Sequence, residues 1–274
     1  MSNTDLAVPD RPDGCAVQRV DLLDVPFDVV TFEEAMRRLI ELAQGDAATY
    51  AVTANVDHVV RLHRHPELLP LYTDANVVVA DGTPLIWASR LLRTPLPERV
   101  AGSDLFPALC GEAAEHGLSV FFLGGDPGTA DRAAAVLQSR HPALQVAGTY
   151  CPEFGFENDP EECDRIVDLI RQASPNILFV GLGSPKQEQW IAQYRDACHA
   201  KLSIGIGISF SFVCGDVVRA PRWMQRLGLE WFHRLCQEPG RLWRRYLVRD
   251  LRFFALVIRE FRKRRGRLRH TPVP

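Results

Sequence analysis

The sequence predicts an α/β fold with a mainly parallel sheet, helices on both faces, and a basic helical appendage at the C-terminus. Three observations support this prediction. Short apolar runs alternate with helical stretches of ten to sixteen residues, a spacing typical of crossovers between parallel strands. Two of the apolar runs end in glycine turns that lead into helices. Residues 219–274 turn helical and strongly basic.

The elements follow one another in a regular order. A short hairpin is expected over 20–30. Because apolar runs rich in β-branched and aromatic residues indicate buried strands, strands are expected at 50–53, 77–80, 120–123, 144–147, 177–180 and 202–208. Helices are expected at 32–43, 83–92, 104–116, 129–139, 160–173 and 185–198. Such a sheet is Rossmann-like. We predict disorder for 1–18, a catalytic domain at 19–215 and the appendage at 216–274.

The turn after the strand 177–180 is the most informative segment. Its glycine turn and capping-box pattern comprise Gly181, Gly183, Ser184, Pro185 and Gln187. Such a turn directs backbone N–H groups and a helix N-terminus at the carboxyl edge of the sheet, where anions bind in open α/β folds. A purely structural connection is the alternative. Lys186 and Glu188 add more polar chemistry to the first turn than a cap requires.

Polar side chains end two other strands. Asp81 directly follows the strand 77–80 and precedes a helix start at Gly82. A carboxylate there points into the ligand crevice, and partial burial raises its pKa to suit general-base work. Asp also caps helices well, so capping is the alternative. Thr53 and Asn55 end an earlier strand and offer a hydroxyl and an amide at the same edge.

Two loops carry weaker signals. Arg99 precedes a helix that Ser103 is expected to cap. A loop guanidinium can hold a phosphate through two hydrogen bonds, although most loop arginines are only solvated. Gly124 and Gly125 form a second glycine turn, which matches neither a Walker loop nor a G-x-G-x-x-G fingerprint.

Several classes of function lack their sequence signatures. No D-x-D pair is present to clamp a metal-bound nucleotide sugar, and no metalloprotease, serine-hydrolase or kinase motif appears. The seven cysteines include no C-x-x-C pair, which argues against a disulfide framework or a zinc site. Neither a signal peptide nor an apolar run of eighteen residues is recognisable. We therefore expect a protein of the cytosol or of a surface facing it.

A net charge of −2 conceals a strong asymmetry. Residues 219–274 carry 16 Lys/Arg against 4 Asp/Glu, whereas residues 1–218 carry 16 against 30. Such a split suggests a polyanionic partner for the tail. A long helix after Pro239 is expected to carry an apolar stripe of Leu247, Leu251, Phe254, Ile258 and Phe261. Its opposite side carries Arg245, Arg249, Arg252, Arg259 and Lys263. A basic amphipathic helix of this kind binds anionic bilayers; the alternative is an ordinary surface helix packed on the α/β body.

Several segments resemble, in order, the motifs of the WecG/TagA/CpsF glycosyltransferases. They are Thr53-Ala54-Asn55, Ala80-Asp81-Gly82-Thr83-Pro84, Glu98–Asp104, Phe122–Gly125, Gly181–Glu188, Arg219-Ala220-Pro221 and Gly228-Leu229-Glu230-Trp231 through Glu238-Pro239. The resemblance extends from about residue 20 to 260. It departs from the family pattern at Cys151-Pro152 and at Phe210-Ser211, which bears on the sugar or acceptor used.

The resemblance implies an inverting, metal-independent transfer of a sugar from a UDP-sugar to a polyprenyl-diphosphate-linked acceptor at the cytoplasmic membrane face, without a cofactor. It makes Asp81 the general base, Thr53 and Asn55 positioning groups for a sugar, and Arg99 a partner of the diphosphate. The substrate-binding residues that it implies are Gly82, Ser103, Asp104, Gly124, Gly125, Gly181, Gly183, Lys186, Gln187, Glu188, Arg219 and Arg226.

The partners implied are the two substrates and, through the basic tail, an anionic membrane surface; nucleic acid is not expected. The donor sugar, the linkage and homo-oligomer formation stay open. So do two other functions. The first is an NAD-dependent oxidoreductase, but the sequence lacks the G-x-G-x-x-G motif and the acidic residue about twenty positions later that binds the ribose in such enzymes. A non-enzymatic membrane or nucleic-acid adaptor would act through the tail and leave Asp81 and Gln187 dispensable.

Overall fold

The fold is built on one parallel sheet, as predicted. The computed structural model describes residues 17–226, 228–244 and 249–269. Six strands pair in the order β4-β3-β8-β7-β5-β6, and every pairing is parallel. They are β3 (Thr49–Ala54), β4 (Val77–Ala80), β5 (Ser119–Gly124), β6 (Gln145–Tyr150), β7 (Ile177–Gly181) and β8 (Leu202–Gly205). Each predicted strand is present, and β8 ends earlier than expected.

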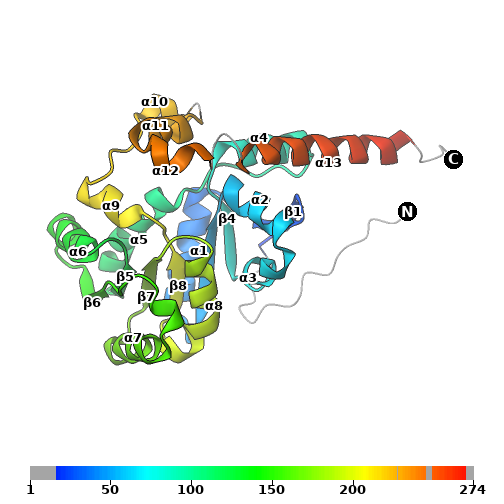
Figure 1. Cartoon of the computed structure of the whole chain (residues 1–274). Coiled ribbons are helices and arrows are strands. Elements are labelled where there is room, and N and C mark those ends of the chain that lie inside the picture. Colours follow the sequence, from blue (N-terminus) through cyan, green and yellow to red (C-terminus); the bar gives the residue numbers. More distant parts are fainter. Residues whose placement is uncertain (1–16, 227, 245–248, 270–274) are drawn as a thin grey trace.

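Helices cover both faces of the sheet (Figure 1). One face packs against α1 (Phe32–Gln44), α5 (Gly102–Glu115), α6 (Thr129–Arg140) and α9 (Ser209–Cys214). The other packs against α2 (Val56–Arg64), α3 (Pro70–Thr73), α4 (Thr83–Leu91), α7 (Pro160–Ala173) and α8 (Lys186–Cys198). Single 3₁₀ turns occur at Pro66–Leu68 and Phe156–Asn158. Every helix predicted for the α/β region is therefore found.

The predicted hairpin is also found and covers one edge of the sheet. Strands β1 (Arg19–Leu22) and β2 (Val25–Asp28) pair antiparallel. The buried carboxylate of Asp28 accepts from Nε of Arg19 (2.7 Å) and from the backbone N–H of Val78 in β4 (2.8 Å). The backbone N–H of Val78, which faces outward from the edge strand β4, therefore has a hydrogen-bond partner. The predicted disordered segment 1–18 lies, apart from its last two residues, outside the described residues.

Four buried phenylalanines fix the centre of the core. Phe106, Phe122, Phe179 and Phe210 have ring centroids 4.9–5.7 Å apart, mostly edge to face, the arrangement that aromatic quadrupoles favour. Gly181 provides the space for this packing, because a Cβ there would lie 2.8 Å from Cε2 of Phe210. The cluster joins α5, β5, β7 and α9 and so sets the position of the loops beyond β5 and β7.

The C-terminal helices lie beyond one end of the sheet, and the last of them extends away from the other three (Figure 1). They are α10 (Arg222–Arg226), α11 (Glu230–Gln237), α12 (Pro239–Arg244) and α13 (Leu251–Arg269). The long helix predicted after Pro239 corresponds to α12 and α13, and residues 245–248 between them lie outside the described residues. Within the described ranges, none of the helices combines the length and apolar character needed to cross a bilayer.

The predicted apolar stripe of the last helix is not the face that packs on the α/β body, so the alternative of an ordinary packed surface helix is wrong for this stripe. Phe253 and Val257 are buried in the core that includes α2, whereas Leu251, Phe254 and Ile258 are about half exposed. Apolar side chains occupy two neighbouring faces of α13, so spacing alone could not select the packed one. Phe261 is half-buried. Two other members of the predicted pattern, Arg245 and Leu247, lie outside the described residues.

The close approach of β5 to β7 generates a stability prediction. Gly124 has φ +95°, and an added Cβ would lie 2.8 Å from the carbonyl oxygen of Gly181. We expect Gly124→Ala to lower the free energy of unfolding by about 3 kcal/mol, from overpacking and backbone strain together. Gly128→Ala is the matched control: its φ is +74° but nothing lies within 4 Å, so only the strain, about 1 kcal/mol, is expected. Urea unfolding followed by tryptophan fluorescence measures both; equal losses would contradict the packing argument.

Candidate functional site

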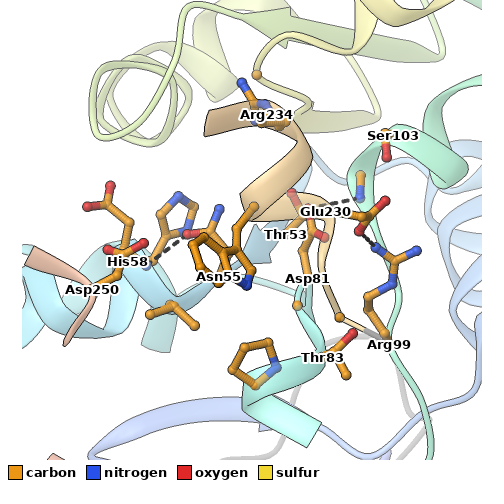
Figure 2. A pocket seen from close by; sticks show the side chains of 18 of the residues that line it. Thr53, Asn55, His58, Asp81, Thr83, Arg99, Ser103, Glu230, Arg234 and Asp250 are labelled. Carbon is orange, nitrogen blue, oxygen red and sulfur yellow. Dashed lines mark hydrogen bonds and ion pairs between the residues drawn. The ribbon is translucent and has the colours of Figure 1, made fainter. Parts of the chain in front are cut away.

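A cavity of about 670 Å³ lies at the carboxyl edge of the sheet (Figure 2). Its walls are the loops that follow β3, β4, β7 and β8, with the starts of α11 and α13. Ligands of open α/β folds bind in the crevice outside the carboxyl ends of the strands. The cavity occupies that place, and residues as far apart in sequence as Thr53 and Phe254 meet in it.

Asp81 lies at the centre of the cavity wall (Figure 2). Its backbone N–H donates to the carbonyl of Ala54 (2.8 Å), and Oδ2 accepts from the backbone N–H of Gly102 (3.3 Å). The alternative that Asp81 caps the next helix is wrong, because α4 is capped at Gly82 without a side-chain hydrogen bond. The carboxylate is therefore available to a ligand.

The surroundings of Asp81 suit it to accept a proton. Burial raises the pKa of Asp81 to about 6; the positive charge of Arg99 opposes this rise, and the negative charges of Glu230 and Asp104 add to it. A general base works best when its pKa lies near the operating pH. The carboxylate is thus mostly ionised at neutral pH and basic enough to take up a proton.

The end of β3 contributes a second group of polar side chains. Thr53 and Asn55 both line the cavity, as the sequence predicts. The buried Thr53 hydroxyl donates to the carbonyl of Gly205 (3.4 Å), and Oδ1 of Asn55 caps α2 by accepting from the N–H of Asp57 (3.0 Å). His58, one turn into α2, is buried and also faces the cavity. Sequence analysis gave that histidine no role, because a single histidine in a helix carries no motif.

Arg99 also lines the cavity, but it is not an unpaired loop arginine. It forms ion pairs with Glu230 and with Asp104 (3.3 Å to the latter). Arg219, a further lining residue, donates to both carboxylate oxygens of Asp104 (2.5 and 2.7 Å). Ser103 lines the cavity as expected. Its predicted capping role is wrong, because α5 begins at Gly102 and is capped without a side-chain bond.

The turn between β7 and α8 differs from the predicted capping box. The cap residue is Pro185, without a side-chain hydrogen bond, and the hydroxyl of Ser184 accepts instead from Arg61 (2.7 Å). Gln187 is buried and accepts from the backbone N–H of Gly207 (3.1 Å), the loop after β8. Tertiary partners therefore use both side chains that the capping pattern requires. The cavity still reaches this turn, at Gly183, Ser184 and Gln187.

The structure does not bring every predicted residue to the cavity. Gly82 lines it, but Gly124, Gly125 and Gly181 do not; these three glycines pack against one another or against Phe210. Lys186 forms an ion pair with Glu157 and lies over the ring of Phe154 (4.9 Å). Glu188 is buried behind the cavity and accepts from Nε2 of Gln187 (2.8 Å). Arg226 belongs to α10, and its side chain lies outside the described part of the chain.

Sequence analysis missed several residues of the site. Glu230 and Arg234 of α11 line the cavity, and so do the aromatic residues Trp87, Trp231 and Phe254. Glu230 stood within a recognisable sequence segment, but only the fold places it beside Arg99, 131 positions earlier. No three described His, Cys, Asp or Glu side chains gather in a group that could hold a metal ion.

Comparison with known proteins gives a consistent result. The model of the glycosyl transferase WecG/TagA/CpsF family matches residues 20–267. A Bacillus subtilis (strain 168) N-acetylglucosaminyldiphosphoundecaprenol N-acetyl-beta-D-mannosaminyltransferase is 33% identical over 71% of this chain and 73% of its own length. A Staphylococcus aureus (strain MRSA252) protein of the same name is 31% identical over 79% of this chain and 84% of its own. The chain therefore belongs to the WecG/TagA/CpsF family and is a glycosyltransferase.

Proposed function

We propose that this enzyme transfers N-acetylmannosamine from a UDP-sugar, with inversion, to N-acetylglucosamine linked through a diphosphate to a polyprenol. The names of the relatives support the sugar and the acceptor. One observation carries the mechanism: the partly buried carboxylate of Asp81 lies in the same cavity wall as the guanidinium groups of Arg99 and Arg219. Membership of a glycosyltransferase family replaces the oxidoreductase and adaptor alternatives.

The proposed reaction is a single displacement. The oxygen of the acceptor hydroxyl attacks the anomeric carbon of the donor, and Asp81 takes up the proton of that hydroxyl. The bond from that carbon to the diphosphate oxygen breaks, and UDP leaves with the bonding electrons. Attack on the face opposite UDP converts an α-linked donor into a β-linked product, in keeping with the β-linkage in the relatives' name.

Positive side chains around the cavity meet the charge of the leaving diphosphate. Arg99, Arg219 and Arg234 all line the cavity, and preorganised charge of this kind stabilises a developing anion. The Nε of Arg234 has no hydrogen-bond partner among the described residues. We propose that these guanidinium groups do the work that a metal ion does in D-x-D glycosyltransferases. Gly183 and Ser184, just ahead of α8, place a helix N-terminus in the same cavity.

We further propose that the enzyme works at the inner, cytoplasmic face of the membrane, on an anionic bilayer. Large exposed apolar side chains, including Trp87, Leu251 and Phe254, line the mouth of the cavity. Ile258 continues this exposed face along α13, beside exposed basic residues such as Arg259. Apolar side chains flanked by cations suit the headgroup region of an anionic bilayer. The acceptor lipid would then reach the cavity from the membrane.

A transfer assay tests the function as a whole. Purified enzyme is incubated with UDP-N-acetylmannosamine and an N-acetylglucosaminyl-diphosphate lipid, and the product linkage is read by NMR. We expect a β-linked disaccharide. The same assay is run with a panel of other UDP-sugars. Preferential turnover of another donor would refute the assignment of N-acetylmannosamine but would leave the reaction type in place.

The general-base role predicts the effect of one substitution. Asp81→Asn removes the basic oxygen with little change in size, so kcat should fall about 1000-fold, while UDP affinity measured by calorimetry stays nearly unchanged. For the unaltered enzyme, kcat/KM should decline below pH about 6, because protonation of the raised Asp81 carboxyl removes the base. Unreduced turnover by Asp81→Asn would eliminate this role.

The metal-free mechanism predicts that the initial rate is the same with and without an excess of EDTA. The reason is that guanidinium groups, rather than a metal ion, stabilise the charge of the leaving diphosphate. The assay is run after dialysis against chelator. A loss of rate that magnesium or manganese restores would contradict the proposal. The variant Arg99→Gln, assayed in parallel, should lose rate under both conditions.

The membrane proposal predicts that exposed residues of α13 control binding to vesicles. A triple variant with Leu251, Phe254 and Ile258 changed to Ser should partition at least tenfold less into phosphatidylglycerol vesicles, because each lost apolar group weakens insertion. Co-sedimentation measures the partition, and Leu169→Ser, at an exposed residue of α7, is the control. Unchanged sedimentation of the triple variant would exclude α13 as the contact.

A further inference from the structure

Four charged side chains form a closed ring of ion pairs beside Asp81. Arg99 pairs with Glu230 and, at 3.3 Å, with Asp104. Arg219 donates to both oxygens of Asp104 and its Nε lies 3.8 Å from Oε1 of Glu230. Cations and anions therefore alternate around the ring, and each guanidinium touches both carboxylates. Figure 2 shows Glu230 and Arg99 facing one another next to Asp81.

The ring joins parts of the chain that are far apart in sequence. Arg99 and Asp104 belong to the loop and first turn of α5, at the sheet edge, whereas Arg219 and Glu230 belong to residues 219–237, which we call the cover. The cover forms one wall of the cavity. Besides the ring, Gly228 packs closely on Thr83 at the start of α4, where an added Cβ would lie 2.9 Å away. The ring is thus a polar attachment between the cover and the catalytic edge.

The partial exposure of the ring indicates that it orients side chains and contributes little to the stability of the fold. Its side chains are 17% (Arg99) to 38% (Asp104) exposed, and ion pairs open to solvent add little to the free energy of folding. Hydrogen bonds from a planar guanidinium to two carboxylates, however, fix its orientation. The ring therefore determines where two arginines point more than how stable the protein is.

We propose that Glu230 is a positioning residue: it holds the guanidinium of Arg99 and the start of α11 in one arrangement, so that both ring arginines face the cavity when a diphosphate donor enters. Glu230 is suited to this because one carboxylate contacts both arginines from the cover side. Donor phosphates then find the guanidinium groups already oriented. This inference rests on the proposed function, in which Asp81 is the base and the arginines meet the diphosphate.

The arrangement links Glu230 to the ionisation of Asp81. The charged groups that act on Asp81 are Arg99, Glu230, Asp104 and Arg219. Glu230 raises the pKa of Asp81, and Arg99 lowers it. Neutralising Glu230 removes one negative charge that raises the pKa of Asp81, and it also removes one of the two ion-pair partners of Arg99. The pKa of Asp81 should fall, and the acid limb of the activity profile should move to lower pH.

The experiment compares Glu230→Gln with Glu230→Asp and Asp104→Asn, by recording kcat and donor KM from pH 4.5 to 8. We expect Glu230→Gln to lower kcat/KM at pH 7.5 roughly 10- to 100-fold, the cost of misplaced catalytic groups, and to shift the acid limb downward. Glu230→Asp keeps the carboxylate and should restore part of the rate. Asp104→Asn should shift the acid limb less, because Asp104 acts more weakly on Asp81 than Glu230 does. Hydrogen exchange should show faster exchange of α11 amides in Glu230→Gln.

A purely structural role predicts a different outcome. It would lower the melting temperature and the active fraction without moving the acid limb, and that result, or an upward shift, would overturn the inference. Glu33→Gln, at an exposed carboxylate of α1, controls for loss of one negative charge and should match the unaltered enzyme. If Asp81→Asn retains full turnover, the proposed function fails. If Asp81→Asn loses turnover as expected but Glu230→Gln leaves the acid limb unmoved, only the proposed role of Glu230 is refuted.

Discussion

The partial burial of the Asp81 carboxylate is the constraint on which the rest of the site depends. A buried carboxylate is tolerated only where hydrogen bonds or opposite charges offset its lost hydration. The N–H of Gly102, the first residue of α5, and the guanidinium of Arg99, in the loop before it, supply that offset. Closure of the cavity comes from the cover, which the chain adds after the sheet is complete. The chemistry of one strand end is therefore set by residues about 150 positions later.

Much of the fold could be predicted because its signals are local. Except for the edge strand β6, each sheet strand is a largely apolar run that is buried on both sides. Each following helix begins at a recognisable break, as Asp159 shows by capping α7 through the N–H groups of Glu161 and Glu162. Asp81 was identifiable for the same reason, since the carboxyl end of a buried strand can be located from the chain alone. Parallel pairing then brings Asp81 and Thr53 to one edge, with Ala54 opposite Ala80.

The remaining features depend on partners that are distant in sequence. The Ser184 pattern is sufficient for a cap, yet Arg61 of α2 takes the hydroxyl, and Gly207 takes the side chain of Gln187. On α13, Phe253 and Phe254 are adjacent and equally apolar, and only the surface of α2 decides which one is buried. The glycines at 124, 125 and 181 match a substrate-binding pattern in the sequence, but in the structure they allow close packing of the neighbouring segments. Local patterns specify what a segment can do, and tertiary contacts select among those options.

The proposed contact of the bilayer with the aromatic and aliphatic rim of the cavity, where Trp87 is about half exposed, would change how the acceptor reaches the enzyme. An enzyme whose entrance lies in the headgroup layer meets its acceptor by lateral diffusion, in two dimensions. The concentration that governs its rate is then the mole fraction of acceptor in the bilayer, whereas the nucleotide donor arrives from bulk solution. Inert lipid would dilute one substrate and leave the other untouched, so the composition of the membrane itself becomes a determinant of flux.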